Sequence, residues 1–223
     1  MDQQVVGGTI EADFQFPWVI DVSGTLTGKG VLIAPTWVLT AAHVVETSFG
    51  GVRVSYSRTD PKTGKVSAGN KSTAPGSVSV HPDYKTGSPY ADLALVRLSS
   101  PFASDPFLQP AALPAAVAAV GQAGTIASIS HTETLPPGKV AVWRGPIILN
   151  GGKTFIAKSP TASLCPGDSG SGFLRLDLEC PSQLIDVPYA STQQTEAGTS
   201  PEGLGLKMQP IPPGAIIGVQ PGQ

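Results

Sequence analysis

Short runs of apolar and β-branched residues recur along the chain, and tight-turn sequences separate them. Such runs are typical of β-strands rather than of long helices. The pattern predicts strands at 18–22, 30–33, 37–40, 52–56, 77–80, 93–98, 125–129, 140–142, 154–157, 172–176 and 183–187. Residues that favour tight turns separate these strands, as in Pro61-Lys62-Thr63-Gly64. Strands at this density predict an all-β protein, built as a sandwich or a pair of barrels.

One stretch departs from this pattern. Residues 110–120 are rich in alanine, with Pro114 inside and Gly121 after them. We interpret this stretch as a connector, containing a strand or a short helical turn, between two halves at 1–110 and 111–223 of one domain. A cleft is expected between the halves. Near the end, the proline-rich segment 209–214 forbids a helix, and residues 215–220 resemble another apolar strand.

Composition supports this organisation and excludes several classes of protein. The 223 residues include 26 Gly and 22 Pro, but only 13% charged residues, which suits many strands joined by turns. The net charge is -2 and no basic stripe is visible, so we expect no nucleic-acid partner. No apolar run reaches the roughly 20 residues that span a bilayer. We therefore expect no membrane association.

Three histidines and the cysteines Cys165 and Cys180 offer no metal-ligand spacing, and we expect neither a metal nor a cofactor. The start Met1-Asp2-Gln3-Gln4 lacks the apolar stretch of a signal peptide.

The segment Cys165-Pro-Gly-Asp-Ser-Gly-Ser-Gly172 places Ser169 between glycines. Glycines allow a sharp turn that exposes a serine hydroxyl, and the amides of Gly167 and Ser169 can converge on one point there. Such a pair would stabilise a developing oxyanion, at roughly 3–4 kcal/mol per donor. Taken alone, the segment is equally well interpreted as a glycine-rich turn with a solvent-facing serine.

A serine hydroxyl needs a base to accept its proton. His43 follows the apolar run 37–39 and ends Thr40-Ala41-Ala42-His43, where small neighbours leave space around the ring. His81 is expected to be a polar turn residue, and His131 a surface residue. Asp92 precedes the apolar strand 93–98, so it is expected to be partly buried and to need a partner. Its alternative interpretation is a capping or turn aspartate.

These segments occur in the order Thr-Ala-Ala-His, Asp-Leu-Ala-Leu-Val-Arg-Leu and Gly-Asp-Ser-Gly, as in the chymotrypsin/trypsin family of serine peptidases. Further similarities are Val5-Val6-Gly7-Gly8, Phe16-Pro17-Trp18 and His81-Pro82-Asp83-Tyr84. The resemblance covers most of the chain to about residue 208. It implies two antiparallel six-stranded β-barrels with the active site in the cleft between them. His43, Asp92 and Ser169 would be base, orienter and nucleophile.

The resemblance also implies how the site is activated and what it selects. Cleavage before Val5 would free an amine that pairs with Asp168 and orders the oxyanion turn; a chain that begins at Met1 would be zymogen-like, or Asp168 would have another partner. Alignment places the base of the primary pocket at Ser163, with Tyr189 on the substrate-binding strand. Ala190 and Gly203 would be small walls. The expected enzyme is a monomer that acts on a protein or peptide substrate, and an uncharged pocket predicts cleavage after apolar or aromatic residues.

Several departures from the family pattern also bear on these expectations. Gly28 and Val44 stand where animal members usually carry a disulfide, which is typical of a microbial branch, and Ser171 replaces a glycine. Cys180 falls too early to be the usual partner of Cys165, so no bond between them is predicted. We expect a secreted enzyme whose export signal is missing from this chain. The alternatives are a non-catalytic binding protein on the same fold and a latent zymogen.

Overall fold

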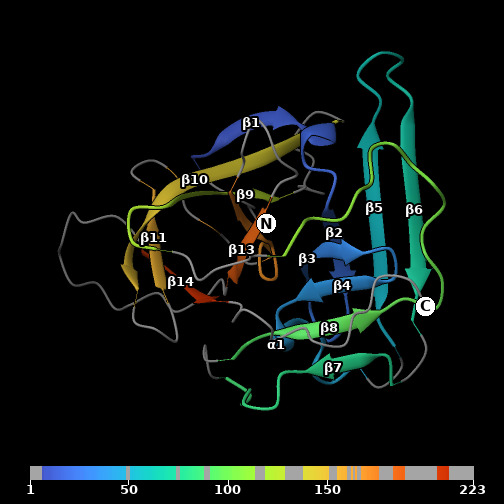
Figure 1. Ribbon diagram of the computed structural model, residues 1–223. Coiled ribbons are helices and arrows are strands. Elements are labelled where there is room, and N and C mark those ends of the chain that lie inside the picture. The colour runs from blue at the N-terminus through green and yellow to red at the C-terminus, as the bar shows by residue number, and fades with distance from the viewer. Residues whose placement is uncertain are drawn as a thin grey trace.

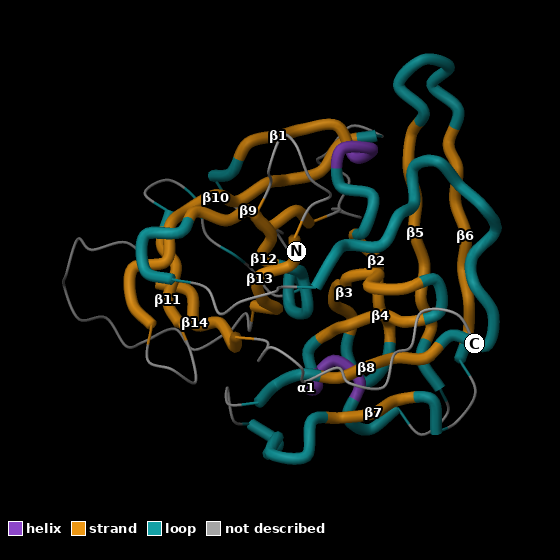
Figure 2. The backbone as a smooth tube through the Cα atoms, in the orientation of Figure 1, coloured by secondary structure: helices purple, strands orange, loops and turns teal. Residues whose placement is uncertain are grey.

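The structure is a computed structural model of the chain. It describes residues 7–48, 51–73, 76–87, 91–113, 119–128, 138–150, 155–159, 162, 164, 167–175, 183–188 and 205–210. Strands dominate these ranges (Figure 2), and the helical segments in them are the 3-10 turn η1 (Asp13–Gln15) and α1 (Ala42–Val45). Among the described residues, no helix is long and apolar enough to cross a membrane.

The first half of the chain forms an antiparallel sheet of seven described strands in the order β6-β5-β2-β3-β4-β8-β7. These strands are β2 (Val19–Ser23), β3 (Thr27–Ala34), β4 (Trp37–Thr40), β5 (Arg53–Thr59), β6 (Val66–Ser72), β7 (Val78–Val80) and β8 (Ala94–Arg97). Hairpin β5–β6 extends beyond the other strands at one side of the molecule (Figure 1). Alternate residues of β5 are buried, which is the period-two pattern of a strand with one face on a core.

The second half forms a closed barrel. Its sheet has the order β1-β10-β11-β14-β13-β12-β9, and a further pairing of β9 with β10 closes a ring of six strands. The strands are β1 (Thr9–Ala12), β9 (Ala123–Ser128), β10 (Lys139–Asn150), β11 (Phe155–Lys158), β12 (Phe173–Arg175), β13 (Gln183–Pro188) and β14 (Gly205–Pro210). The predicted all-β class with two barrels is therefore confirmed.

Strand β1 adds to the outside of this ring. It pairs with β10 in the register Thr9↔Val142 to Ala12↔Lys139. The sequence division at residue 110 places residues 9–12 in the first half, whereas their hydrogen bonds belong to the second sheet (Figure 1). The described part of the chain thus starts with β1 on the second barrel and crosses to the first at η1.

Three apolar clusters hold the barrels. One fills the first barrel, around Ile20, Val38 and Val54. A second lies in the other barrel, where the rings of Trp143 and Phe173 meet edge to face at 6.1 Å between centroids. The third cluster contains residues of both sheets: Phe16, Trp18, Val19, Val31, Leu39, Leu93, Ala111, Ala127, Val140, Val142 and Leu174. Because this shared cluster packs the two sheets together, their relative position is fixed by apolar burial.

Charged groups are also buried near this shared cluster. Arg58 is fully buried and donates hydrogen bonds to the carbonyls of Phe16 and Val19. Burial lowers the pKa of Arg58 to about 10, and the neighbouring carboxylates of Asp13, Asp21 and Asp105 oppose that shift. A buried charge needs such partners, so these residues fix the path of the chain between η1 and β2.

Candidate active site

His43 lies on α1, directly after β4. The residues of β4 point alternately into different clusters, with Val38 in the first barrel's core and Leu39 in the shared cluster. This double anchoring fixes the end of the strand, and α1 begins at Ala42, two residues later. The His43 side chain is 18% exposed, so solvent and ligands reach part of the ring.

Asp92 holds His43 at two points. Its Oδ2 lies 2.7 Å from Nδ1 of the ring, and its Oδ1 accepts the backbone N–H of His43 at 2.9 Å. The carboxylate is fully buried, with 0% side-chain exposure. A carboxylate only accepts, so in the neutral form of the imidazole Nδ1 carries the proton and Nε2 presents a lone pair. The alternative of an ordinary capping aspartate does not account for both contacts.

The residue before Asp92 has an unusual backbone conformation. Ala91 has φ of 54°, and it is the one non-glycine residue with positive φ among those described. Its carbonyl accepts the N–H of Leu93 at 2.8 Å, which turns the chain sharply ahead of β8. Such a conformation costs roughly 1–2 kcal/mol for an L-residue, and surrounding structure must hold it. The strain therefore lies beside the carboxylate that orients His43.

The segment around Ser169 forms a tight turn. Gly167 and Gly170 have φ of 95° and 83°, and the N–H of Ser171 bonds the carbonyl of Asp168 at 3.0 Å. Ser169 is 6% exposed. A Cβ on Gly170 would lie 2.1 Å from the Lys29 carbonyl oxygen, so both conformation and space require glycine there.

This turn packs on β3 and on β4, the strand that leads into α1 and His43. The Ser169 carbonyl accepts the N–H of Lys29 in β3 at 2.7 Å. The Cβ position of Gly170 lies 2.4 Å from Thr40 Oγ1 and 3.1 Å from the Ala41 amide nitrogen, just before α1. The structure thus brings the Ser169 turn against the β4–α1 junction, and His43 and Asp92 together beside it.

The positions of the family disulfide also face one another. A Cβ built on Gly28 would lie 2.8 Å from Val44 Cγ2 and 2.7 Å from the Ser169 carbonyl oxygen. Packing of Val44 therefore fills this place without a sulfur bridge.

Other predicted residues separate into two groups. Asp168 is fully buried directly before Ser169, and His81 lies in a turn where its Nδ1 accepts the Asp83 N–H at 3.1 Å. The second group lies outside the described residues: Val5, His131, Ser163, Cys165, Cys180, Tyr189, Ala190 and Gly203. Close to Ser163, the Ala162 carbonyl accepts the Trp143 indole N–H at 2.9 Å, and β13 ends at Pro188, directly before Tyr189.

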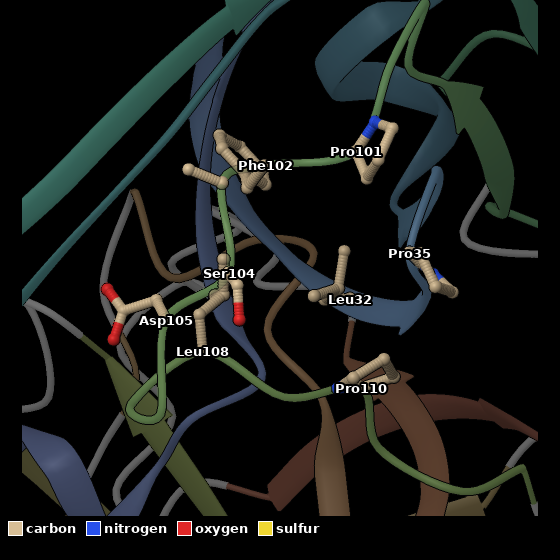
Figure 3. A pocket seen from close by; sticks show the side chains of 9 residues that line it. Leu32, Pro35, Pro101, Phe102, Ser104, Asp105, Leu108 and Pro110 are labelled. Carbon is tan, nitrogen blue, oxygen red and sulfur yellow. The ribbon is translucent and has the colours of Figure 1, made fainter.

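A separate pocket lies on the first barrel. Its volume is about 160 Å³, and the segment after β8 forms much of its wall together with Leu32 and Pro35 (Figure 3). None of its lining residues is a predicted site residue. In the described part of the chain, no group of three or more His, Cys, Asp or Glu residues is placed to hold a metal ion.

Sequence reasoning missed Lys29 and Asp21. Lys29 is fully buried, its N–H bonds Ser169, and its Nζ lies 2.7 Å from Asp21 Oδ1. The sequence did contain a signal for this pair, because each of the apolar segments 19–22 and 28–33 contains one charged residue.

Comparison with solved structures gives the class of fold. The chain is similar to the crystal structure of the scabies mite inactivated protease paralogue S-I1, with a TM-score of 0.73 and 19% sequence identity. The match covers 94% of this chain and 99% of that one. At this identity the likeness shows the fold, which is that of the two-barrel serine proteases.

Sequence comparison gives the family. A family model described as Trypsin matches residues 5–199, and the chain belongs to the trypsin family of serine peptidases. It is 36% identical over 120 residues to the complement C1s subcomponent of Bos taurus, covering 50% of this chain and 17% of the relative. It is 31% identical over 116 residues to vitamin K-dependent protein C of Mus musculus, covering 51% of this chain and 25% of that protein.

A third relative is the ovochymase of Halocynthia roretzi, with 27% identity over 123 residues, 52% of this chain and 8% of that protein. The matched segments are thus a quarter or less of these three relatives' lengths. All three come from animals, and the microbial branch suggested by Gly28 and Val44 stays a prediction.

Proposed function

We propose that this chain is a serine endopeptidase in which Ser169 is the nucleophile, His43 the base and Asp92 the orienter. The observation that carries the proposal is the double contact of the buried Asp92 with His43. It fixes the imidazole in the tautomer whose Nε2 accepts a proton, which is the state a serine nucleophile needs.

The proposed reaction has two halves. His43 takes the Ser169 hydroxyl proton as Oγ bonds to the peptide carbonyl carbon, and it then gives that proton to the leaving amine as the C–N bond breaks. Water deprotonated by the same imidazole then attacks the acyl-enzyme, and the proton returns to Oγ as the acid is released. The amides of Gly167 and Ser169 are proposed as the oxyanion donors, supported by the positive φ of Gly167.

Activation and specificity are also proposals. We propose that cleavage before Val5 frees the amine that pairs with Asp168, whose fully buried side chain directly precedes Ser169. With Ser163 at the base of the pocket and Tyr189, Ala190 and Gly203 around it, we propose cleavage after apolar or aromatic side chains. Secretion stays a prediction from the sequence.

A non-catalytic role on the same fold is the alternative, and the solved neighbour is itself described as inactivated. The presence of His43, Asp92 and Ser169 together in this chain supports the active form. A fluorophosphonate probe tests this, because it reacts covalently with an activated serine. The protein is labelled with and without residues 1–4, beside Ser169→Ala. We expect labelling that depends on Ser169; labelling of the alanine variant, or of neither form, contradicts the catalytic assignment.

A peptide panel with Phe, Leu, Ala or Arg at the cleaved position tests the pocket separately. We expect the highest kcat/KM after Phe or Leu, because no carboxylate at position 163 would attract a cation. Fastest cleavage after Arg overturns the assignment of Ser163.

A further inference from the structure

A buried ion pair lies directly behind the Ser169 turn. The Lys29 ammonium lies 2.7 Å from Asp21 Oδ1, and the two side chains are 0% and 9% exposed. Lys29 in β3 and Asp21 in β2 are cross-strand partners, so their side chains share one face of the sheet.

That face is the one between the barrels. The neighbouring pair in the same register on this face is Val19↔Val31, and both valines belong to the cluster shared by the two sheets. Residues two apart in a strand point the same way, so the ion pair lies on the side of β2 and β3 that packs toward the second barrel.

The main chain of Lys29 contacts both parts of the site. Its N–H donates to the Ser169 carbonyl at 2.7 Å, and its carbonyl accepts the Thr40 hydroxyl at 2.6 Å. One bond reaches the nucleophile turn, and the other reaches the last residue of β4, ahead of α1 and His43. Backbone and side chain of this one residue are therefore all held by directional bonds.

Stability alone is a weak reason for such a pair. Desolvation of two buried charges offsets much of their attraction, and apolar replacements of similar volume are often neutral or stabilising. A buried charge pair does, however, restrict the geometry more than apolar contacts, which tolerate small shifts. Because Lys29 bonds to Ser169, a restricted position of Lys29 also restricts the position of the Ser169 turn.

We propose that Lys29, held by Asp21, is a positioning residue that fixes the Ser169 turn relative to the β4–α1 junction and His43. The inference rests on the proposed peptidase function for its kinetic consequence. Its structural content is independent: loss of the ion pair loosens the Lys29–Ser169 hydrogen bond.

Three variants test this role. Lys29→Met removes the ammonium and keeps the apolar stem. Lys29→Met/Asp21→Leu replaces the whole pair by apolar side chains. Val54→Ala is the matched control, because it opens a cavity in the first barrel's core without touching the pair. Each variant is measured below its own Tm, with kcat and KM determined separately and amide hydrogen exchange followed at Lys29.

We expect Lys29→Met to lower kcat at least 10-fold with KM changed less than 3-fold, and to speed exchange at the Lys29 amide at least 10-fold. The double variant regains part of the lost Tm, since Arg58 also loses the nearby carboxylate of Asp21, but it keeps the low kcat and the fast exchange. Val54→Ala lowers Tm and leaves kcat within 2-fold. Recovery of both Tm and kcat in the double variant overturns the inference, because the pair would then only stabilise the fold.

The two proposals fail differently. If the wild-type protein is not labelled by the fluorophosphonate in either form, the peptidase function fails, and Lys29 is judged on exchange alone. If labelling is normal and Lys29→Met matches the wild-type kcat and exchange rate, the positioning role fails and the peptidase function stands. Should Lys29→Met not fold, the double variant carries the same comparison.

Discussion

Asp92 and His43 are joined by two hydrogen bonds from the two oxygens of one carboxylate. Oδ2 lies 2.7 Å from the imidazole Nδ1, and Oδ1 accepts the His43 backbone N–H at 2.9 Å. The second bond fixes the start of α1 as well as the ring. A single buried side chain thus sets both the position of the main chain and the tautomer of the neutral imidazole.

Asp92→Asn separates these two effects. The amide oxygen can still accept the His43 backbone N–H, but the NH₂ group donates to Nδ1 and leaves the proton on Nε2. We expect kcat to fall about 10⁴-fold because the base is then in the wrong tautomer. The measurement is kcat on a peptide substrate, with circular dichroism as the control for folding. A loss below 10-fold in a folded variant contradicts the proposed role of Asp92.

Ala91 supplies a second test next to the same carboxylate. The backbone of Ala91 has φ of 54°, a value that a β-branched residue rarely adopts, and the Ala91 side chain is buried. We expect Ala91→Val to lower the free energy of unfolding by more than about 1 kcal/mol and to reduce kcat several-fold as Asp92 shifts. Ala91→Gly removes the strain but adds chain entropy, so it stays within about 1 kcal/mol of wild type.

Urea unfolding measures these free energies. The control is Ala103→Val at an exposed position without positive φ, which is expected to stay within about 0.5 kcal/mol. Equal losses at positions 91 and 103 would show that the strain at Ala91 does not matter.

Much of the fold followed from the sequence because its strands have a strong local signal. Each strand predicted between residues 18 and 187 overlaps an observed one, and β4 was predicted with its observed bounds, whereas the apolar segment 215–220 lies outside the described residues. Apolar runs such as 37–40 are recognisable because both faces are buried. In the three strands that were not predicted, β1, β6 and β14, polar residues interrupt the apolar ones, and their pairing partners rather than their composition make them strands.

The candidate site divided in the same way. His43, Asp92 and Ser169 could be proposed from the sequence because each lies in a short motif of fixed order. Lys29 could not be proposed in this way, because no local sequence pattern indicates that its N–H bonds to Ser169, more than a hundred positions away. Its partner Asp21 also becomes visible only through the register of β2 on β3. Long-range hydrogen bonds of this kind depend on topology.

Asp105 gives a prediction about pH. Burial alone would raise the pKa of its carboxyl, but hydrogen bonds from Ser67, Phe107 and Tyr56 and the charge of Arg58 hold that pKa below its usual value. A depressed pKa in the folded state means that the unfolded chain binds protons first as pH falls. The stabilisation is therefore complete above about pH 4 and is lost as pH falls through the folded-state pKa.

Urea unfolding from pH 7 to pH 2.5 measures this effect for wild type and Asp105→Asn. We expect the variant to be less stable at pH 7, and the difference between the two proteins to shrink below about pH 4. Parallel curves over the whole range would show that Asp105 adds no acid-dependent stability.

Gly170 is expected to tolerate no side chain. Its φ of 83° costs an L-residue roughly 1–2 kcal/mol, and overpacking adds roughly 1–3 kcal/mol. The overpacking arises because a Cβ would meet the Lys29 carbonyl oxygen at 2.1 Å and Thr40 Oγ1 at 2.4 Å. Gly170→Ala should therefore lower the free energy of unfolding by more than about 2 kcal/mol, measured by urea unfolding. It should also slow fluorophosphonate labelling, since Ser169 is displaced with the turn.

Gly64→Ala is the matched control. Gly64 has a similar φ of 68° in the β5–β6 turn, but nothing lies within 4 Å of its Cβ position. It bears the conformational cost alone, so we expect a loss of about 1 kcal/mol and an unchanged labelling rate. The difference between the two variants isolates the contact between the Ser169 turn and the strands β3 and β4. Equal losses at the two glycines would show that this contact is loose, and would also weaken the positioning role assigned to Lys29.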